Sequence, residues 1–518
     1  MTPQEEQAGL LMTDPKVRNR LAAGALQRLG KTSPAPLYSE AFASRITPGN
    51  LEDDLAKLSQ ADWIIEAVTE NLQVKKKFIQ PHRKRMEPGI IVSSNTSGIS
   101  INEMAEDCSE EFRRHFMGAH FFNPPRYMKL LEVVPGEKTA QELVTFMQEF
   151  GSRTLGKGVV IAKDTPNFIA NRIGTYGLMV TLREMLEKGY TVEEVDAVTG
   201  PAMGRPKSAT FRTLDLVGLD TFVHVARNVY DHLKDGQEKA VFFEMPAVLN
   251  EMVAQGWTGE KMGQGFYKKV KGAEGSVIEA LNLNSKEYAP ARKVSSASLE
   301  AAKAAKGAAP RLKALLSTPD KYSSLAWDVL KHVLIYSAEK LGEIADTIVD
   351  IDNAMKWGFN WDLGPFETWD AIGLSRSVKR MEEEGLTVPV WVKEWIEQGN
   401  ESFYQRREGE TLYYLRSEYA SLDAPAERIS LQALKQRGKV IRSNTGASLV
   451  EIGDGVACLE FHSPNNAIGA DILSMISQSV DEAEANYKGL VIANEGKKLL
   501  RRREPDAAAD GSAGRRVG

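Results

Sequence analysis

This sequence has few cysteines, no net positive charge and no long apolar run, and each of these absences excludes a class of protein. The two cysteines, Cys108 and Cys458, lie far apart and outside any CxxC pattern, which argues against a disulfide scaffold or a cysteine-built metal site. No stretch approaches the roughly 20 apolar residues of a membrane span. The formal net charge of -5 offers no cationic field to nucleic acid. We therefore expect a cytoplasmic protein without a metal site, a membrane span or a nucleic-acid partner.

The length of the chain requires several domains. Its 518 residues exceed the roughly 250 to 300 at which single hydrophobic cores stop growing, so we expect three or four units. Apolar residues make up 42% of the chain, which is ordinary for a soluble protein. Residues 1–9 are polar and acidic and lack the basic and then apolar pattern of a secretory signal, so no export is expected.

Helices and strands alternate over residues 1–165. The pattern begins with a helix at 14–29 and not with a strand. Strands spaced by helices are typical of a parallel, doubly wound sheet, so we predict an α/β domain. The predicted strands are 44–47, 63–68, 90–94, 117–121, 130–134 and 158–162, and the further helices are 51–58, 75–86, 100–105 and 140–150.

Long helices replace this alternation after Pro166, and strands are not expected again until the far end of the chain. Residues 174–219 and 336–374 resemble each other, since both run from a helix to a Val-Asp or Ile-Asp turn and end on Val-Gly-Leu or Ile-Gly-Leu. Duplication of one helical unit explains the two copies. The predicted parts are a helical domain at 166–270 that opens with a helix at 167–188, a linker at 271–320 whose segment 295–310 is a surface helix or a linker, and a second helical repeat at 321–425.

Strand patterns return near the carboxyl end of the sequence. Strands at 447–452, 456–461 and 490–493, with a helix at 471–486, indicate a further domain at 438–496. After Gly496 the chain has no apolar periodicity and cannot bury a core, so we predict a disordered tail at 497–518.

A histidine and a carboxylate stand on neighbouring predicted strands. His120 and Glu132 have a spacing that permits a hydrogen-bonded pair. A carboxylate that fixes one ring nitrogen of a histidine is the usual arrangement for a general base near neutral pH. The alternative is a satisfied core histidine, which is the more common fate of a histidine between apolar residues.

Small polar residues gather where predicted strands end. Ser94 to Gly98, with the sequence SNTSG, follows a buried strand, and ligands of doubly wound folds bind at this carboxyl edge. The alternative is helix capping by Ser97 or Ser100. Asn171 lies one turn into a largely apolar helix, where its amide needs a partner.

Several motifs together resemble the 3-hydroxyacyl-CoA dehydrogenase family, whose order and spacing they share. They are EAVTENLQVKKK (66–77), SSNTSGISI (93–101), GAHFFNPPRYMKLLEVVPG (118–136), KDTPNFIANR (163–172) and MGQGFYKK (262–269). The resemblance covers about residues 10–269. The duplicated helical unit, to about residue 422, is similar to the longer multifunctional members, and residues 440–495 resemble the opening strands of an enoyl-CoA hydratase.

This resemblance implies a fold and a reaction. The fold is α/β: an incomplete Rossmann-type NAD-binding domain, duplicated all-α dehydrogenase C-terminal domains and the start of a crotonase-like β/α domain. The reaction is the NAD-dependent oxidation of a 3-hydroxyacyl-CoA in fatty-acid β-oxidation. The implied partners are the acyl-CoA substrate and either a second copy of the chain or a β-oxidation enzyme such as a thiolase.

The resemblance also implies roles for individual residues. His120 would remove the proton from the 3-hydroxyl, and Glu132 would orient His120. Ser97 and Asn171 would hold the reacting oxygen. Four residues match family positions near the cofactor: Glu70, Lys75, Ser97 and Asn123. For Lys75, one of three consecutive lysines, the alternative is a solvated helix face.

The sequence departs from the family pattern at two places. The first βαβ unit of the family carries a GxGxxG turn and a later acidic residue, whereas Gly9, Gly24 and Gly30 have the wrong spacing and no preceding strand. In hydratases the strand that matches 489–493 leads into a loop whose amides form the oxyanion hole, and the residues from Lys497 onward are unrelated to it. Hydratase activity is therefore not expected. A late start and a shifted reading frame near Gly496 would explain both departures.

Two other functions compete with an active dehydrogenase. A non-catalytic fragment would keep the substrate-side residues and bind acyl-CoA or a partner without turnover, and the missing glycine turn favours it. A two-domain dehydrogenase of small hydroxy acids is the third reading. The combination of HFFNP, SNTS and DTPNFIANR favours acyl-CoA over small hydroxy acids.

Overall fold

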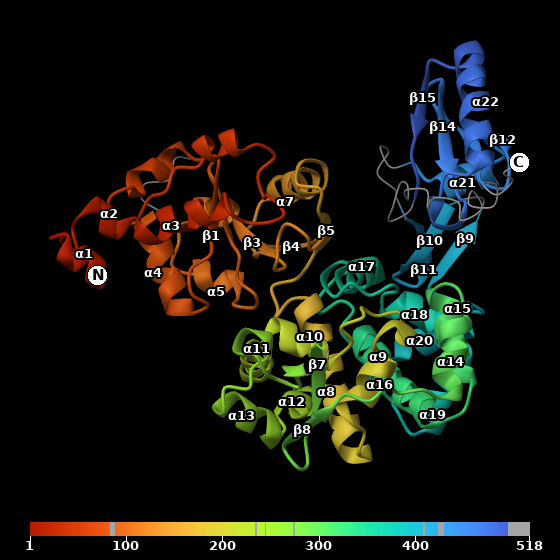
Figure 1. Ribbon diagram of the computed structural model, residues 1–518, viewed down its shortest axis with the longest axis horizontal. Coiled ribbons are helices and arrows are strands. Elements are labelled where there is room, and N and C mark those ends of the chain that lie inside the picture. Colours follow the sequence, from red (N-terminus) through yellow and green to blue (C-terminus); the bar gives the residue numbers. More distant parts are fainter. Residues whose placement is uncertain are drawn as a thin grey trace, which may run out of the picture. The chain divides into compact units, whose positions relative to one another are not determined.

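The computed structural model describes residues 1–82, 89–233, 236–243, 245–272, 275–407, 410–422 and 429–495. The chain forms two compact units, Met1–Glu401 and Ser402–Gly518. The first unit contains a five-stranded sheet and most of the helices, and the second contains two smaller sheets (Figure 1).

The five-stranded sheet of the first unit has the strand order β1-β2-β3-β4-β5 and is mixed. β1 runs parallel to β2 and β2 to β3, β3 and β4 are antiparallel, and β4 and β5 are parallel. The expectation of an all-parallel sheet is therefore wrong for one pair. Only residues 122–129 separate β3 from β4, which is too short for the crossover that a parallel neighbour needs. The strands are β1 (Trp63–Glu66), β2 (Ile91–Ser94), β3 (Phe116–Phe121), β4 (Leu130–Pro135) and β5 (Gly158–Ile161).

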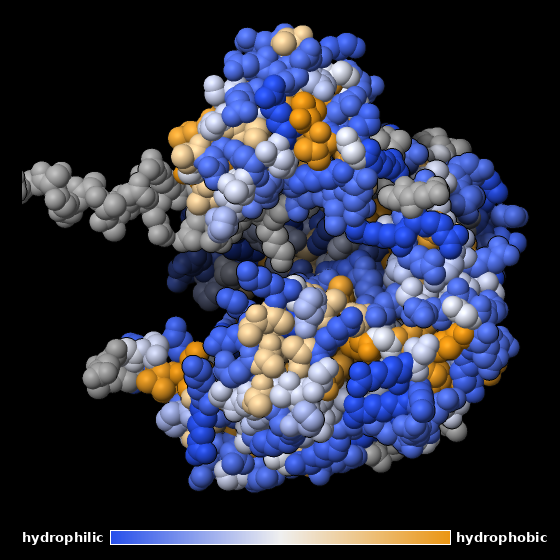
Figure 2. Space-filling view, turned by 90° about the vertical axis from the view of Figure 1, so that its right-hand side faces the viewer, coloured by the Kyte–Doolittle hydropathy of each residue, from blue (hydrophilic) through white to orange (hydrophobic). Residues whose placement is uncertain are grey.

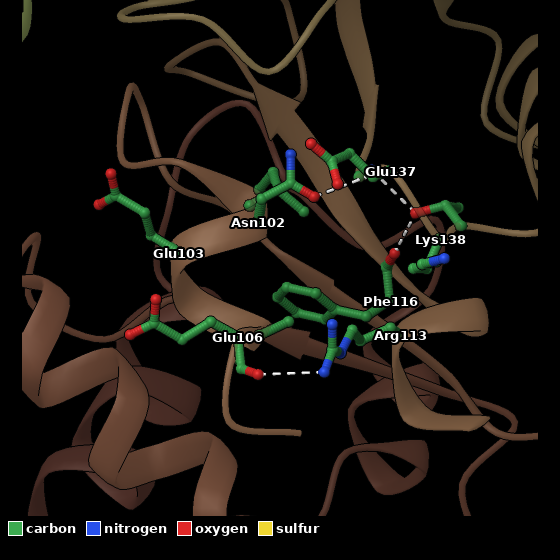
Figure 3. A pocket seen from close by; sticks show the side chains of 11 residues that line it. Asn102, Glu103, Glu106, Arg113, Phe116, Glu137 and Lys138 are labelled. Carbon is green, nitrogen blue, oxygen red and sulfur yellow. Dashed lines mark hydrogen bonds between the residues drawn. The ribbon is translucent and has the colours of Figure 1, made fainter. Parts of the chain in front are cut away.

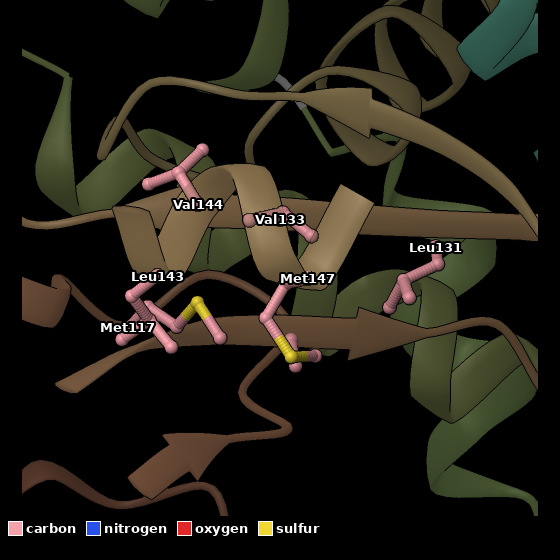
Figure 4. Packing of buried hydrophobic residues seen from close by; sticks show 7 residues of the cluster. Met117, Leu131, Val133, Leu143, Val144 and Met147 are labelled. Carbon is pink, nitrogen blue, oxygen red and sulfur yellow. The ribbon is translucent and has the colours of Figure 1, made fainter. Parts of the chain in front are cut away.

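The core of this domain lies between the sheet and α7 (Gln141–Glu149). Met117 of β3 and Leu131 of β4 are completely buried against Leu143 and Met147 of the helix (Figure 4). Successive side chains of a strand point to opposite faces. Because Met117 and Leu131 face α7, His120 and Glu132, which lie an odd number of positions away, point to the other face.

The segment before β1 differs from its prediction. Residues 44–47, expected as a strand, lie at the end of a 3-10 helix (Glu40–Arg45) and just beyond it, and only a 3-10 helix (Leu55–Gln60) occurs near the helix expected at 51–58. A four-residue stretch with two β-branched residues, such as Ile46 and Thr47, forms a strand only where a neighbouring strand offers a free edge, and a local pattern does not show this. The helices here are α1 (Pro3–Gln7), α2 (Pro15–Arg18), α3 (Arg20–Leu29) and, after β1, α4 (Leu72–His82).

Short helices and a π-helical turn complete the sheet domain, and the helical region begins with α8. Its first turn starts at Ala170, after residues Asn167 and Phe168 with positive φ angles of 61° and 54°. The predicted helix at 167–188 therefore begins three residues late. The elements are α5 (Ile101–Ala105), α6 (Glu110–Arg114), the π-helix Phe150–Thr154, α8 (Ala170–Lys188), α9 (Val192–Thr199), the 3-10 helix Pro201–Met203, α10 (Phe211–Val217), α11 (Leu219–His232), α12 (Gly236–Phe243), α13 (Ala247–Ala254) and the 3-10 helix Glu260–Met262.

The segment 271–320, expected as a linker, is ordered structure. It contains two strands of an antiparallel sheet and two helices, and Leu312 and Leu315 are buried. Alanine is the best helix former, so an Ala-rich stretch becomes helical once a few leucines can be buried. The elements from here to residue 401 are β6 (Tyr267–Gly272), β7 (Gly275–Asn282), β8 (Glu287–Pro290), α14 (Ala297–Ala304), α15 (Ala308–Ser317), α16 (Lys321–Glu339), α17 (Ile348–Gly358), α18 (Pro365–Ile372), α19 (Leu374–Glu383) and α20 (Val390–Glu397).

The second unit consists of two sheets and begins before the predicted boundary at 425. One antiparallel sheet has the order β11-β10-β9, and the other has the order β12-β13-β14-β15, in which α22 connects the parallel neighbours β14 and β15. The tail predicted at 497–518 lies outside the described residues. The elements are β9 (Tyr404–Arg407), β10 (Glu410–Leu415), β11 (Glu418–Ser421), α21 (Leu431–Gln436), β12 (Val440–Ser443), β13 (Ala447–Gly453), β14 (Val456–Phe461), the 3-10 helix Pro464–Asn466, α22 (Ala470–Asn486) and β15 (Gly489–Ile492).

The surface carries apolar residues only in small groups on the face shown in Figure 2. Within the described ranges, none of the helices combines the length and the apolar character that crossing a bilayer requires. Both cysteines, Cys108 and Cys458, are buried, and no disulfide joins them.

Candidate active site

His120 and Glu132 form a buried pair on adjacent strands. The antiparallel register of β3 and β4 sets the two residues directly opposite each other, and His120 Nδ1 lies 2.6 Å from Glu132 Oε2. Glu132 is completely buried and His120 is 4% exposed. The rings of Phe122 and Phe168 lie 4.6 Å and 5.7 Å from the imidazole, so little water screens the pair.

The second oxygen of Glu132 is bound by the start of α8. Oε1 accepts hydrogen bonds from the backbone N–H groups of Ile169, at 3.2 Å, and Ala170, at 2.9 Å. A helix N-terminus favours a negative charge, so these two N–H groups orient and stabilise the carboxylate. Such a carboxylate requires a proton on Nδ1 of His120, which leaves Nε2 unprotonated and able to accept one. The described residues offer Nε2 no hydrogen-bond partner.

The loop after β2 is tied to both neighbouring strands. Asn95 Oδ1 accepts a hydrogen bond from Phe121 N–H at 2.9 Å, which fixes the loop beside the end of β3. Glu70 Oε1 accepts from the Thr96 hydroxyl at 2.6 Å and from Ser97 N–H at 2.8 Å. The loop that carries Ser97 therefore lies next to the strand end that carries His120.

Ser100, and not Ser97, caps the helix α5. Ser100 Oγ accepts from the N–H of Glu103 at the start of α5 and donates to Asp164. The Ser97 hydroxyl has no partner among the described residues. A free hydroxyl at the carboxyl edge of the sheet is available to a ligand.

Lys75 is buried and not on a solvated helix face. Its Nζ lies 3.0 Å from both carboxylate oxygens of Glu66 and 3.3 Å from Glu70 Oε2, and the residue is 0% exposed. The solvated alternative for Lys75 is therefore wrong. Lys75 faces the protein and holds Glu70, which in turn binds the loop at Thr96 and Ser97.

Asn171 and Asn123 complete the set of expected site residues. Asn171 is the second residue of α8 and directly follows Ala170, whose N–H binds Glu132. It is partly buried, and Asn123, just beyond β3, is exposed. Neither side chain has a hydrogen-bond partner in the part of the chain that the structure describes. The contacts through Glu132 bring Asn171 near His120, whereas no described contact links Asn123 to the pair.

Three polar residues of the quoted motifs have roles that the sequence reasoning missed. Asn95 and Thr96 hold the loop, and Asn167 packs against it, since a Cβ on Gly98 would lie 2.0 Å from Asn167 Oδ1. Asn167 also accepts from the Asn228 amide at 2.9 Å. The glycine at position 98 is the sequence signal for this packing, because a residue without a Cβ allows the Asn167 side chain to approach the loop closely.

The residues fit an NAD molecule only in part. The carboxyl ends of β1, β2 and β3, with Glu70, Ser97 and Asn123, are where a doubly wound sheet binds a nicotinamide. The glycine-rich turn for the pyrophosphate is not found: in the described residues no strand pairs with the outer edge of β1, and Gly24 lies inside α3. The nicotinamide side therefore fits, and the described residues do not supply the pyrophosphate side.

A separate pocket of about 230 Å³ lies where β3 begins and β4 ends (Figure 3). Phe116, at the start of β3, and Arg113 line it, and Asn102 accepts a hydrogen bond from Glu137 N–H at 2.8 Å on its wall. His120 lies toward the other end of β3. This pocket is therefore not part of the candidate active site.

Comparison with known proteins identifies the family. Residues 10–165 match the family described as "3-hydroxyacyl-CoA dehydrogenase, NAD binding domain", and residues 168–269 match "3-hydroxyacyl-CoA dehydrogenase, C-terminal domain". A probable 3-hydroxyacyl-CoA dehydrogenase of Deinococcus radiodurans is 46% identical over 262 residues, which are 51% of this chain and 75% of that protein. The chain belongs to the 3-hydroxyacyl-CoA dehydrogenase family.

Another member of the family matches most of the chain. A probable 3-hydroxyacyl-CoA dehydrogenase of Bacillus subtilis is 56% identical over 502 residues, which are 96% of this chain. The chain spans 62% of the length of that protein. The expected family, the Rossmann-type NAD-binding domain with its helical C-terminal domain, and NAD as the cofactor are thereby confirmed.

One solved structure shares the fold over most of the chain. The 3-hydroxybutyryl-CoA dehydrogenase of Escherichia coli aligns with a TM-score of 0.56 and 23% identity, and covers 74% of this chain and 92% of its own. At this identity the likeness shows the fold alone.

Proposed function

We propose that the chain oxidises (S)-3-hydroxyacyl-CoA to 3-oxoacyl-CoA with NAD, as a step of fatty-acid β-oxidation. The observation that carries the proposal is the buried pair of His120 and Glu132, in which Nε2 of the imidazole remains free. Ser97 and Asn171 offer unpartnered polar groups near it. The relatives of Bacillus subtilis and Deinococcus radiodurans carry the name of this activity.

In this reaction His120 is the general base. Its Nε2 takes the proton of the 3-hydroxyl, and Glu132 stabilises the imidazolium that forms, because it lies 2.6 Å from Nδ1. The Ser97 hydroxyl and the Asn171 amide donate to the reacting oxygen and hold it against His120. NAD, when bound, would accept the hydride from the carbon that carries this oxygen.

The cofactor-side residues act in two ways in this proposal. Glu70, Ser97 and Asn123 lie at strand ends where the nicotinamide half of NAD would bind. Lys75 acts through Glu70, because its ammonium is enclosed by Glu66 and Glu70. A buried lysine between two carboxylates fixes the loop geometry and does not itself need to reach the cofactor.

We propose that the helical domain is duplicated, at 166–270 and 321–425. Equivalent contacts support this. Thr191 and Thr347 cap α9 and α17, and Asp196 in α9 accepts from Phe211 N–H just as Asp352 in α17 accepts from Phe366 N–H. Later in each copy, further pairs agree in sequence and conformation: Gly218 with Gly373 and Gly256 with Gly399 at positive φ, and Pro246 with Pro389 before α13 and α20.

The domain at 438–496 is proposed to be the start of a crotonase-like fold. An antiparallel pair, β13 and β14, followed by α22 and the parallel strand β15 supports this. Hydratase activity is not expected of it. The cytoplasmic location, and a partner that is a second copy or a thiolase, stay predictions. The two buried cysteines form no disulfide, which agrees with a reducing compartment.

The test of the proposed function combines cofactor binding with turnover. Purified chain is titrated with NADH by fluorescence, and reduction of acetoacetyl-CoA is followed through the absorbance of NADH. The variant His120→Gln loses turnover, whereas His115→Gln, a partly buried histidine just before the same strand, keeps it. A folded chain that shows neither NADH binding nor turnover contradicts the proposal.

A further inference from the structure

The geometry of the His120 and Glu132 pair depends on the first turn of α8. Glu132 uses one oxygen for His120 and the other for the N–H groups of Ile169 and Ala170. A shift of that turn would therefore rotate the carboxylate. Asn171 follows in the same turn, so both the orienting carboxylate and the amide move with the start of the helix.

A buried arginine anchors this turn from behind. Arg172 is 0% exposed, and its Nη1 donates to Pro166 O, in the segment before the helix, at 3.0 Å. Its Nε and Nη2 donate to Glu238 Oε1 at 2.9 Å and 2.6 Å. Nε also lies 2.7 Å from the Tyr336 hydroxyl, and Nη2 lies 3.0 Å from Glu343 Oε1. An arginine fork with this many partners has only one orientation available.

Two of the four partners of Arg172, Tyr336 and Glu343, come from the second helical repeat. Tyr336 belongs to α16. Lys340 is the C-cap of this helix, and Glu343 lies three residues further along the chain. Lys340 Nζ lies 2.6 Å from Glu238 Oε2 and 2.9 Å from Glu343 Oε2. Two positive and two negative side chains therefore balance in one network, which joins α8, α12 and the end of α16 (Figure 1).

Residues 342–344 of the second repeat also bind Lys163, at the other end of the segment 163–172. Lys163 N–H donates to Ile344 O at 2.9 Å, and Lys163 Nζ donates to Gly342 O at 2.7 Å. Residues 163–172 are thus held at both ends by residues 336–346. The first repeat supplies Asn171 and the N–H groups that bind Glu132, and the second repeat holds the segment that carries them.

We propose that Arg172, Tyr336 and Glu343 are positioning residues of the active site, through which the second helical repeat fixes the orientation of Glu132 and Asn171. The expected change in kcat rests on the proposed function. The expected change in the environment of His120 rests on the geometry alone. Removing one partner loosens the turn and misorients His120, whereas the loop that carries Ser97 keeps its own contacts with Glu70 and Phe121.

Conservative variants test this. Tyr336→Phe keeps the ring stacked on Tyr176, at a centroid distance of 3.8 Å, and removes only the hydroxyl; Glu343→Gln removes the charge of a half-exposed side chain. The matched control is Tyr190→Phe, which removes a tyrosine hydroxyl that bonds Lys321 O at the other end of the same two helices. Circular dichroism and thermal unfolding identify variants that have lost the fold.

Two readouts separate positioning from mere stability. In the full chain with ¹⁵N-labelled histidine, the Nδ1–H proton of His120, assigned with His120→Gln, gives a downfield NMR signal. We expect Tyr336→Phe and Glu343→Gln to move or broaden this signal and Tyr190→Phe to leave it unchanged. For acetoacetyl-CoA reduction, kcat of the two test variants falls roughly 10-fold while KM stays near the wild-type value, because misplaced groups lose rate and not binding.

The outcomes distinguish the two proposals. An unchanged His120 signal in folded Tyr336→Phe and Glu343→Gln overturns the positioning role, whether or not the chain turns over. Wild-type kcat in both variants of an active chain overturns it as well. A chain without turnover in which the signal still moves supports the positioning role and contradicts the proposed function.

Discussion

Replacement of Glu132 by glutamine tests the catalytic pair most directly. Glu132→Gln keeps the volume of a completely buried side chain and removes its charge. The remaining carbonyl oxygen can still accept the N–H groups of Ile169 and Ala170, now at 3.2 Å and 2.9 Å from Oε1. The expected loss of folding stability is therefore modest, about 1 to 2 kcal/mol, as for weakened buried hydrogen bonds.

The expected effect on turnover is much larger. With its oxygen turned to the helix, the glutamine presents an NH₂ group to Nδ1 of His120. This group donates, so the imidazole must carry its proton on Nε2, and Nε2 can no longer accept the proton of the substrate. A positioned general base contributes about 10² to 10⁴ in rate. We expect kcat to fall roughly 10³-fold, which corresponds to about 4 kcal/mol of transition-state stabilisation.

The assay is reduction of acetoacetyl-CoA by NADH, with urea unfolding on the same samples. Glu137→Gln is the matched control: it makes the same substitution at an exposed glutamate just beyond the end of β4, and we expect it to change neither turnover nor stability. If folded Glu132→Gln retained turnover within about three-fold of the wild type, His120 would not depend on this carboxylate and the general-base assignment would be refuted.

Three further predictions concern the loop and the helical repeat. Lys75→Met leaves the buried carboxylate of Glu66 without its lysine and should cost about 3 to 5 kcal/mol in urea unfolding, whereas Lys77→Met, on the exposed part of the same helix, should cost less than about 0.5 kcal/mol; equal losses would contradict the buried ion pair. Gly98→Ala brings a Cβ within 2.0 Å of Asn167 Oδ1 and should destabilise the chain by about 1 to 3 kcal/mol, and an unchanged melting temperature would show that the loop has room. Burial opposes the charge of Asp320, but hydrogen bonds from Ser323 and Ser298 outweigh this and hold its pKa at about 2, below the usual 3.8. Because the folded pKa is the lower one, this stability is present above pH 4 and is lost as the pH falls toward 2; Asp320→Asn should flatten the decline in stability between these values, and an unchanged slope would contradict it.

Much of the active site could be predicted because it is built from contiguous motifs. His120 and Glu132 stand near the ends of strands whose apolar residues alternate or run continuously, and that pattern is local. Once the two strands pair, the side chains meet at 2.6 Å. Ser97 likewise follows a buried strand directly, so its place at the sheet edge follows from the element boundaries.

Other features depend on neighbours far away in the sequence. The three consecutive lysines at 75–77 look alike locally, and only the helix orientation decides that Lys75 points at Glu66 while Lys77 stays exposed. The antiparallel direction of β4 follows from the short connection after β3. Residues 44–47 have strand-like composition but no strand partner among the described residues.

The sequence alone therefore determined the family and the strands that carry His120 and Glu132, because motif spacing and apolar periodicity are properties of nearby residues. Only the tertiary structure decided which charged groups are buried and what holds the segment 163–172. Arg172 reaches Glu238 and Glu343, which lie 66 and 171 positions away along the chain; the first contact forms only after the first repeat has folded, and the second only after the two repeats have packed. Burial and charge pairing are consequences of that packing, and for this reason local sequence patterns do not specify them.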